Sequence, residues 1–152
     1  MKNFRKLSDF DLENKTIGVI GTGRIGQQLI QIANGLNMTV LAYDAFPNPE
    51  LTNHLKFIYV DLSKLLSNSD IITLHVPGIK QTEHLINSSN IQQFKKGSIL
   101  INTARGSVVE TAALITALDQ SILRGAGLDV IENEADRDNL AARPNVIITP
   151  HN

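Results

Sequence analysis

A run of buried-strand residues passes directly into a helix-like pattern near the beginning of the chain. Residues 16–21, TIGVIG, are apolar and rich in β-branched side chains, which is typical of a strand inside a parallel sheet. The apolar residues that follow recur every three or four positions and predict a helix: Ile25, Leu29, Ile32 and Leu36. A strand that leads into a helix through one short turn begins a β-α-β unit, so this stretch favours an α/β fold.

The same alternation continues along the chain. We expect further strands at residues 38–43, 56–60, 70–76, 98–102, 125–130 and 145–149. Helices are expected at residues 48–55, 61–69 (with Asp61 as N-cap), 88–97 (with Gly97 as C-cap) and around the apolar stripe Val108, Ala112, Ile115, Leu118 and Ile122. Right-handed crossovers then predict one doubly wound parallel sheet, with strand order 3-2-1-4-5-6 and a ligand crevice between the first and fourth strands.

The composition narrows the classes of partner. The 152 residues suffice for one domain, and only 5% are aromatic among 42% hydrophobic, so Val, Ile and Leu dominate, as in parallel sheets. The formal net charge is −1 with scattered Lys and Arg, which argues against nucleic acid or an anionic membrane surface and favours a small molecule. With no cysteine, four separated histidines and no apolar signal or membrane segment, we expect no disulfide, no metal site and a cytoplasmic location.

The turn after the first predicted strand reads GTGRIG, with Gly21, Gly23 and Gly26 in G-x-G-x-x-G spacing. Glycines also recur in ordinary turns, so the pattern gains its meaning from the strand before it and the helix after it. In that setting the first glycine allows a tight turn, the second lets the backbone approach a pyrophosphate, and the third permits close helix-to-strand packing. The backbone amides of Arg24 and Ile25 would then face the phosphates.

Asp44 follows the second predicted strand, about 20 residues beyond the glycine loop. A carboxylate there accepts hydrogen bonds from the hydroxyls of an adenosine ribose and repels a 2′-phosphate. No arginine follows in the loop AFPNPE, so NAD is favoured over NADP as the cofactor of a Rossmann-type domain. The alternative is an aspartate that only stabilises the turn.

The fourth predicted strand ends in HVPGIKQT, beside the expected crevice. Pro77 is sufficiently explained as a residue that stops the strand. Val76 and Pro77 could also form an apolar wall for adenine or ribose, with Thr82 nearby. His75 is either a hydrogen-bonded histidine at a strand end or part of the site, and both alternatives stay open at this point.

The last three predicted strands end in polar side chains that together form an acid–base set. Arg105 follows the fifth strand, Glu132 and Glu134 lie beyond the sixth, and His151 follows the seventh. Each alone is more simply a solvated surface residue, above all Glu132, which stands in an acidic stretch. Together, a guanidinium can hold a substrate carboxylate while a histidine exchanges a proton with a hydroxyl near neutral pH. With a nicotinamide in the crevice, the matching chemistry is hydride transfer between NAD and a 2-hydroxy or 2-keto acid.

Five stretches together resemble the NAD-dependent D-isomer-specific 2-hydroxyacid dehydrogenases over about residues 16–151: GVIGTGRIG, LHVPGIKQTEHLIN, LINTARGSVVE, GAGLDVIENE and RPNVIITPH. The resemblance implies that Arg105 binds the substrate carboxylate, that His151 donates and accepts the proton, and that Glu134 adjusts that histidine. It also implies that Asp129 contacts the nicotinamide carboxamide. The other residues implied to line the NAD site are Gly21, Gly23, Arg24, Ile25, Gly26, Asp44, Val76, Pro77, Thr82, Thr103, Ala104 and Arg105.

The loops YDAFPNPEL and VPGIKQTEHLIN look most like the D-lactate dehydrogenase branch, so pyruvate and D-lactate type substrates are implied. The family builds its substrate domain from flanking segments, whereas here only residues 1–15 precede a dinucleotide-binding domain at 16–152, and the stretch 134–151 is short for this branch. We therefore expect a single domain that lacks the substrate domain, has little or no turnover by itself, and forms the homodimer usual in the family. The alternatives are a non-enzymatic NAD(H) sensor similar to corepressors of this fold, and an inactive truncated fragment.

Overall fold

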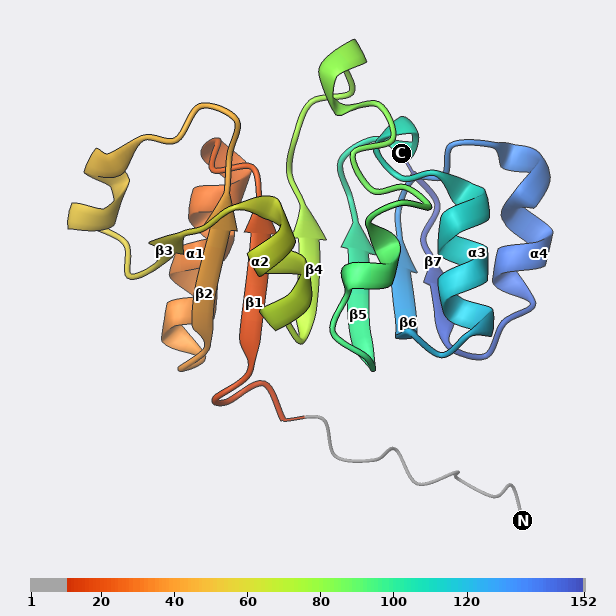
Figure 1. Cartoon of the computed structure of the whole chain (residues 1–152), viewed down its shortest axis with the longest axis horizontal. Helices are drawn as coiled ribbons and strands as arrows, with labels where there is room; N and C mark the ends of the chain where they lie inside the picture. Colours follow the sequence, from red (N-terminus) through yellow and green to blue (C-terminus); the bar gives the residue numbers. More distant parts are fainter. Residues whose placement is uncertain (1–10, 152) are drawn as a thin grey trace.

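Seven parallel strands form one sheet in the computed structural model, which describes residues 11–151 (Figure 1). Residues 1–10 of the expected lead segment and residue 152 lie outside the described residues. The strands are β1 (Thr16–Ile20), β2 (Thr39–Tyr43), β3 (Ile58–Tyr59), β4 (Ile71–Leu74), β5 (Ser98–Asn102), β6 (Leu123–Leu128) and β7 (Val146–Ile148). Their order is β3-β2-β1-β4-β5-β6-β7, which confirms the doubly wound sheet and its switch point between β1 and β4.

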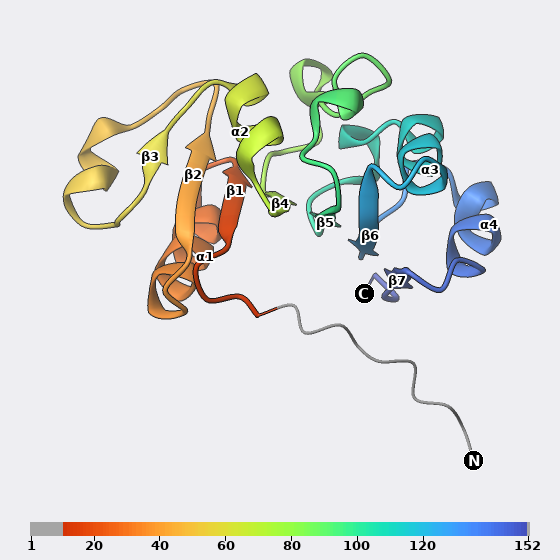
Figure 2. The same ribbon diagram turned by 60° about the horizontal axis from the view of Figure 1, so that its bottom comes forward.

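Helices cover the sheet unequally. Helix α1 (Arg24–Gly35) lies on one face, whereas α2 (Leu62–Asn68), α3 (Thr111–Asp119) and α4 (Arg137–Ala141) lie on the other (Figure 2). Short 3-10 helices occupy the connections at Pro49–Asn53, Lys80–Thr82, Ile91–Gln93, Gly106–Val108 and Glu134–Asp136. None of the helices between residues 11 and 151 has the length and apolar character needed to cross a membrane.

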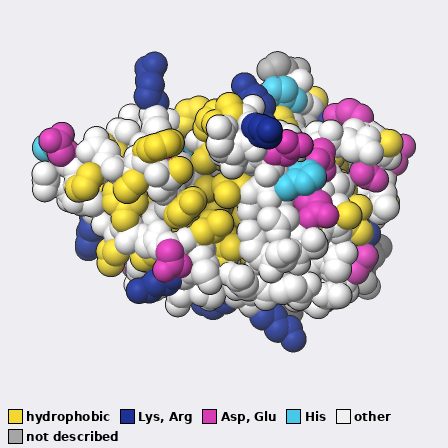
Figure 3. Space-filling model, turned by 45° about the horizontal axis from the view of Figure 1, so that its top comes forward, with side chains coloured by type: hydrophobic (Ala, Val, Ile, Leu, Met, Phe, Trp, Pro, Cys, Tyr) yellow, Lys and Arg dark blue, Asp and Glu magenta, His cyan; other side chains and the backbone are white. Residues whose placement is uncertain are grey.

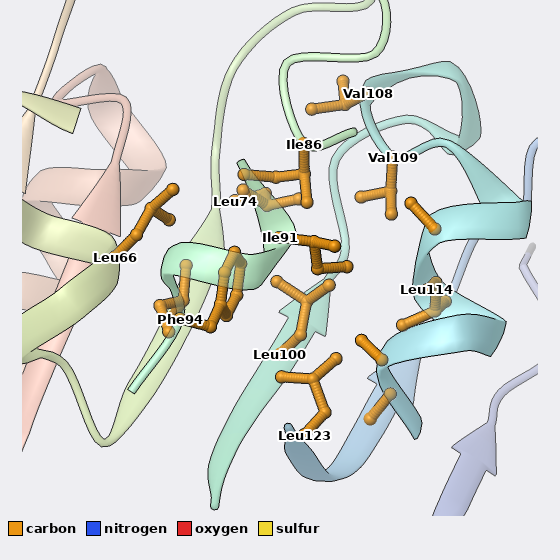
Figure 4. Close-up of a cluster of buried hydrophobic side chains, with 14 of the residues drawn as sticks. Leu66, Leu74, Ile86, Ile91, Phe94, Leu100, Val108, Val109, Leu114 and Leu123 are labelled. Carbon is orange, nitrogen blue, oxygen red and sulfur yellow. The ribbon is translucent and has the colours of Figure 1, made fainter. Parts of the chain in front are cut away.

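The core divides into two clusters because successive strand side chains point to opposite faces of the sheet. Val19 packs with Ile30 and Ala33 of α1, whereas its neighbour Ile20 belongs to the cluster that contains Leu65 and Leu66 of α2. Each full burial of a side chain of this size contributes about 1.5–3 kcal/mol. Figure 4 shows the centre of the second cluster, where side chains from β4, β5, β6 and α3 meet. The two clusters hold the helices against the two faces of the sheet.

The orientation of α1 follows from the close contact of Gly26 with the preceding strand end. The predicted helix is confirmed, but its buried residues are Gly26, Ile30 and Ala33. Ile25 and Ile32, which belong to the apolar spacing seen in the sequence, are 70% and 59% exposed. The spacing therefore identified the helix correctly, but of its four residues Leu29 packs against the core, whereas Ile25, Ile32 and Leu36 are exposed.

The helix expected over residues 88–97 is wrong, because only Ile91–Gln93 forms a 3-10 turn there. The Asn87 side-chain oxygen accepts the backbone N–H groups of Ser89 at 2.9 Å and Asn90 at 3.3 Å. The Asn90 side-chain oxygen in turn accepts the N–H of Asn87 at 3.0 Å. Such side-chain bonds offer the backbone an alternative to a helix. The chain then passes Phe94 in extended conformation with its ring buried in the core.

Smaller differences concern element boundaries. The short helix expected at residues 48–55 is the 3-10 helix Pro49–Asn53, and β3 is shorter than the expected strand at residues 56–60. The helix expected around residues 108–122 is restricted to α3, with Val108 in the preceding 3-10 turn, and α4 was not expected. The N-cap of α2 is confirmed, since Asp61 accepts the backbone N–H of Lys64 at 2.8 Å.

Candidate functional site

The loop at residues 21–26 connects the carboxyl end of β1 to the N-terminus of α1. Gly21 has φ of +98°, and a Cβ on Gly26 would lie 2.0 Å from the carbonyl oxygen of Gly21, so both positions require glycine. Gly23 is the N-cap residue of α1, and a Cβ there would meet nothing within 4 Å. No side chain of the described residues caps this helix, and its first turn holds no acidic residue. The first turn of α1 therefore has backbone N–H groups that no side chain caps, next to open space at Gly23, as a phosphate site requires.

Asp44 lies at the end of β2 and is held from the neighbouring loop. Its Oδ2 atom accepts the backbone N–H of Thr22 at 2.7 Å and the Thr22 hydroxyl at 2.9 Å, and its Oδ1 accepts the N–H of Phe46 at 2.9 Å. Burial acts to raise the pKa of Asp44, but the hydrogen bonds from Thr22 and Phe46 outweigh it and hold the pKa below its usual value. The carboxylate is therefore charged at neutral pH. It lies beside the loop at residues 21–26, which we call the phosphate loop after its expected ligand.

The residues after β4 form an apolar strip beside the phosphate loop. Val76 is half-buried and Pro77 is exposed, and the Thr82 hydroxyl donates to the carbonyl oxygen of Pro77. Figure 3 shows hydrophobic side chains gathered on the left and centre of this edge of the molecule, with histidine and acidic side chains farther right. Exposed hydrophobic residues of these segments include Ile25, in the first turn of α1, and Ile79, two residues after Pro77.

His75 is a hydrogen-bonded histidine at a strand end. Its Nε2 atom lies 2.9 Å from the Thr73 hydroxyl, and burial lowers the pKa of its imidazole. The structure thus favours the structural interpretation of His75 over a place in the site.

The turn after β5 carries Arg105. The Asn102 side chain stabilises this turn, accepting the N–H of Ala104 at 3.0 Å and donating to the carbonyl oxygen of Arg105 at 3.0 Å. The Arg105 side chain is exposed, and its Nη1 atom donates to the carbonyl oxygen of Ala104 at 2.7 Å. Thr103 is exposed and Ala104 is buried. One donor of the guanidinium is thus used locally, and the other N–H groups remain for an anion.

His151 is bonded to Asp129 across the ends of β6 and β7. The register of the two strands places Leu128 beside Ile148, so the residues that follow them are neighbours. The Asp129 Oδ2 atom lies 2.7 Å from His151 Nδ1, and Asp129 Oδ1 accepts the Thr149 hydroxyl at 2.5 Å. These hydrogen bonds from Thr149 and His151 hold the pKa of Asp129 below its usual value.

One cavity of about 380 Å³ brings the polar strand ends together, and its lining includes Arg105, Asp129, Glu134 and His151. Glu134 is 74% exposed and lies 3.7 Å from the Nε atom of Arg137. The expectation that Glu134 adjusts His151 thus differs from the contacts, in which the carboxylate bonded to the histidine is Asp129. Between residues 11 and 151, no group of three or more His, Cys, Asp or Glu side chains is arranged to hold a metal ion.

A sequence profile described as "D-isomer specific 2-hydroxyacid dehydrogenase, NAD binding domain" matches residues 2–152. The chain belongs to this family. A glyoxylate reductase of Thermococcus litoralis is 43% identical over 93% of the chain and 43% of that protein. A D-lactate dehydrogenase of Lactobacillus delbrueckii subsp. bulgaricus is 40% identical over 93% of the chain and 46% of that protein. The chain thus spans less than half the length of these curated relatives.

Solved structures agree with this assignment. The chain superposes on D-lactate dehydrogenase with NAD+ from Lactobacillus jensenii with a TM-score of 0.88 and 41% identity, covering 98% of this chain and 49% of that one. The pyruvate reductase of Chlamydomonas reinhardtii gives a TM-score of 0.90 at 37% identity, covering 99% of this chain and 50% of that one. As the NAD-binding domain of a D-isomer-specific 2-hydroxyacid dehydrogenase, the chain offers groups that suit NAD: open backbone at Gly23, an uncapped helix N-terminus and the ionised Asp44.

Sequence reasoning about this dehydrogenase domain missed three residues that hold the expected ones. Thr22 occupies a variable position of the glycine pattern, Tyr59 ends the short strand β3, and Thr149 lies two residues before His151. The sequence signal for Thr149 was its place at the end of a strand predicted to carry the histidine. Thr22 and Tyr59 carry no comparable signal, because only the register of β1, β2 and β3 brings them together.

Glu132, which the sequence placed in an acidic stretch, is bonded to two other loops of the dehydrogenase domain. It forms an ion pair with His84 Nε2 and accepts the backbone N–H of Thr111 at 3.2 Å. The backbone N–H of His84 also donates to the carbonyl oxygen of Ser107 at 2.8 Å. Glu132 and His84 therefore connect the segments that follow β4, β5 and β6.

Proposed function

We propose that the protein containing this chain transfers a hydride between NAD(H) and a D-2-hydroxy acid or its 2-keto acid, with D-lactate and pyruvate as the favoured pair. The observation that supports this most directly is the single cavity lined by Arg105, Asp129 and His151. A guanidinium, a carboxylate and an imidazole in one cavity are the groups needed to hold an anionic acid and move a proton. Bound NAD would accept or supply the hydride beside them.

Arg105 is proposed to bind the substrate carboxylate. Its hydrogen bond to the Ala104 carbonyl oxygen uses one of the five guanidinium donors, and the planar fork of the others suits two parallel bonds to a carboxylate. The positive charge would also polarise the adjacent carbonyl of a 2-keto acid as negative charge develops on its oxygen. Lysine at this position would keep the charge but lose the fork.

His151 is proposed to exchange the proton with the substrate oxygen. Its Nδ1 atom is engaged by Asp129, so Nε2 is the ring nitrogen left for the substrate. Asp129 fixes the orientation of the imidazole, and Thr149 fixes Asp129 in turn. We also propose Glu134 as a member of this set, because it lines the same cavity.

The proposed NAD site occupies the carboxyl edge from the phosphate loop to the turn after β5, with the domain beginning at residue 16. Asp129, which the resemblance assigns to the nicotinamide carboxamide, would lie at its far end. The other proposed lining residues are Gly21, Gly23, Arg24, Ile25, Gly26, Asp44, Val76, Pro77, Thr82, Thr103, Ala104 and Arg105.

The test is whether the intact protein that contains this chain catalyses the reduction of 2-keto acids. Oxidation of NADH would be followed by absorbance with pyruvate, glyoxylate and hydroxypyruvate, and the highest kcat/KM is expected with pyruvate. A preference for glyoxylate or hydroxypyruvate would keep the reaction and overturn the substrate. Tight NADH binding without turnover on any 2-keto acid would overturn the enzymatic proposal and support an NAD(H) sensor. An Arg105→Lys variant, expected to raise KM for pyruvate by a larger factor than the Kd for NADH, serves as the site control.

We further propose that the protein is a cytoplasmic homodimer, as implied by its resemblance to the family. Sedimentation of the intact protein should give twice the protomer mass at micromolar concentration, and a persistent monomer would contradict the dimer. Fractionation of the native cell should place it with cytoplasmic markers, and recovery in a membrane or secreted fraction would contradict the location.

A further inference from the structure

A chain of hydrogen bonds reaches Asp44 from the neighbouring strand β3 by way of the loop after β1. The Tyr59 hydroxyl, at the carboxyl end of β3, lies 2.8 Å from the Thr22 hydroxyl. Thr22 in turn bonds Asp44 Oδ2 through both its hydroxyl and its backbone N–H. The backbone N–H of Asn48, in the loop that follows Asp44, donates to the Tyr59 oxygen at 3.3 Å. Three segments of the chain therefore meet at one carboxylate.

The direction of each bond follows from the number of protons available. Ionised Asp44 can only accept, so the single hydroxyl proton of Thr22 is used in the bond to Oδ2. The Thr22 oxygen must then accept from Tyr59, which leaves the Tyr59 oxygen free to accept from Asn48. All donors point toward the carboxylate, an arrangement in which neighbouring bonds strengthen one another.

These bonds restrict what Asp44 can offer to a ligand. A carboxylate has about four acceptor positions, two on each oxygen. Thr22 fills two positions with its two bonds to Oδ2, and the N–H of Phe46 fills one on Oδ1. One acceptor position therefore remains on Oδ1. Since the carboxylate cannot rotate without breaking the bonds to Thr22, this last acceptor has a fixed direction.

We propose that Tyr59, acting through Thr22, is a positioning residue for Asp44 and thereby a determinant of NAD affinity and of selectivity for NAD over NADP. Thr22 is only 5% exposed, so the hydroxyl of Tyr59 is the partner that keeps the Thr22 oxygen satisfied on the side away from Asp44. Without it, Thr22 loses the acceptor bond that orients its hydroxyl, so the hydroxyl bond to Asp44 is held less firmly and the carboxylate keeps only the N–H bonds of Thr22 and Phe46. The proposal concerns NAD binding, so its outcome does not depend on whether the intact protein reduces a 2-keto acid.

The first experiment replaces Tyr59 by phenylalanine, which removes one oxygen and retains the ring that packs edge-on against Phe57 at a centroid distance of 4.8 Å. Affinities of this 152-residue chain for NADH and NADPH would be measured by the fluorescence of the bound nicotinamide. We expect the Kd for NADH to rise about three- to tenfold, as for the loss of one orienting hydrogen bond. The Kd for NADPH should change less, since its 2′-phosphate has no favourable bond to Asp44 to lose.

A double-mutant cycle tests whether Tyr59 acts through Thr22. Thr22→Val keeps the shape of the side chain but removes the hydroxyl, and is expected to weaken NADH by about tenfold. In that background Tyr59→Phe should have no further effect, because the bond it removes is already absent. In a Thr22→Ser background, which restores the hydroxyl, the effect of Tyr59→Phe should return. The serine variant also provides the measurement if the valine variant does not fold.

Tyr43→Phe is the matched control, because Tyr43 is the other tyrosine of the sequence and takes no part in this network. Its NADH affinity should equal that of the unmodified chain, and thermal unfolding should show that all variants remain folded. An unchanged NADH affinity in Tyr59→Phe would overturn the proposal. Equal losses for NADH and NADPH would do the same, since they would indicate a general loosening. So would a full Tyr59→Phe effect in the Thr22→Val background.

Discussion

The two halves of the carboxyl edge differ in how their polar side chains are held. In the nucleotide half, formed by residues 21–26 with Asp44 and Tyr59, hydrogen bonds join loops that are far apart in the sequence. Thr22, at the centre of this half, is 5% exposed, and α1 is fixed against β1 through Gly26. The ordering of these groups is achieved when the domain folds, so a ligand meets a site already in place.

The reaction half, formed by Arg105, Asp129, Glu134 and His151, is held in two ways: Asp129 and His151 by bonds between distant segments, Arg105 and Glu134 by near neighbours in the sequence. Arg105 bonds the carbonyl oxygen of the preceding residue, and Glu134 pairs with a residue three positions on. The side chain of His151 is 55% exposed, although its bond to Asp129 joins two strands. This comparison leads us to expect that the nucleotide half is ordered before NAD binds, whereas the proposed reaction needs further ordering of exposed side chains around the substrate.

The largest effect is expected from replacing His151 in the reaction half. In the intact protein, His151→Gln should lower kcat by about 10²- to 10⁴-fold, because it removes the group proposed to exchange the proton. The Kd for NADH should stay unchanged, since the nucleotide half is untouched. Steady-state kinetics with pyruvate and NADH titration would measure both. His54→Gln, at an exposed position after a 3-10 helix, is the control. A parallel loss of NADH affinity in His151→Gln would contradict the separation of the two halves.

The next effect concerns the phosphate loop. Gly23→Val places a side chain in the open space that the pyrophosphate would occupy, so NADH affinity should fall by roughly 30- to 150-fold, about 2–3 kcal/mol. The unfolding midpoint should hardly change, because a Cβ at Gly23 meets nothing within 4 Å.

Gly35→Ala, in the last turn of α1, is the matched control for the loop. A Cβ there also meets nothing within 4 Å, so the change should stabilise the helix by about 0.5–1 kcal/mol and leave NADH affinity unaltered. Calorimetric titration with NADH and urea unfolding would separate the two effects. If Gly23→Val bound NADH normally, the phosphate position would have to be assigned elsewhere.

The sequence predicted the structure correctly where one physical requirement, burial or close approach, acts on residues that are neighbours in the chain. The strand runs and the glycine pattern reflect burial and close approach, so they predicted the sheet order and the position of Asp44. Arg105 and His151 line one cavity, as expected for residues that follow parallel strands with their ends at one edge, and their roles stay predictions. The strand framework and the expected strand-end residues were thus accessible from the sequence.

The failures arise where side chains compete with the backbone or act across strands. The expected helix at residues 88–97 gave way to hydrogen bonds from the Asn87 and Asn90 amides. Thr22 and Tyr59 were missed because a threonine and a tyrosine become partners only through the register of three strands. The bond between Asp129 and His151 likewise depends on the register of β6 and β7, and the role of Glu134 stays a prediction.

A smaller effect is expected from Asp44→Ala, which leaves the phosphate loop in place. NADH affinity should fall by about tenfold, as for the loss of a hydrogen bond to a charged group. The affinity ratio of NADH to NADPH should fall as well, because the charge that repels a 2′-phosphate is gone. Asp61→Ala is the control: loss of the α2 cap costs about 1 kcal/mol of stability without altering NADH affinity. An unchanged ratio in Asp44→Ala would remove the carboxylate from cofactor selection.

The smallest effect concerns the His84–Glu132 pair beside the reaction half. The hydrogen bond to Glu132 raises the pKa of His84, and the negative charges of Glu132, Glu110 and Glu83 act in the same direction. Burial acts to raise the pKa of Glu132, but the hydrogen bonds from His84 and Thr111 outweigh it, and its pKa lies below its usual value. Glu132 therefore remains ionised wherever His84 titrates.

The contribution of this pair to stability should be lost on the alkaline side. The pKa of unfolded His84 is about 6.5 and the folded pKa lies above it, so the contribution is full below pH 6.5 and disappears as the pH rises through the folded value. Because the His84 side chain is 41% exposed, we expect only about 0.5 kcal/mol. Urea unfolding of the unmodified chain and His84→Gln at pH 6 and pH 9 would measure it, and subtracting the two cancels the titration of His75. If the difference in unfolding free energy between the unmodified chain and His84→Gln grew with pH, its sign would contradict a raised pKa of His84.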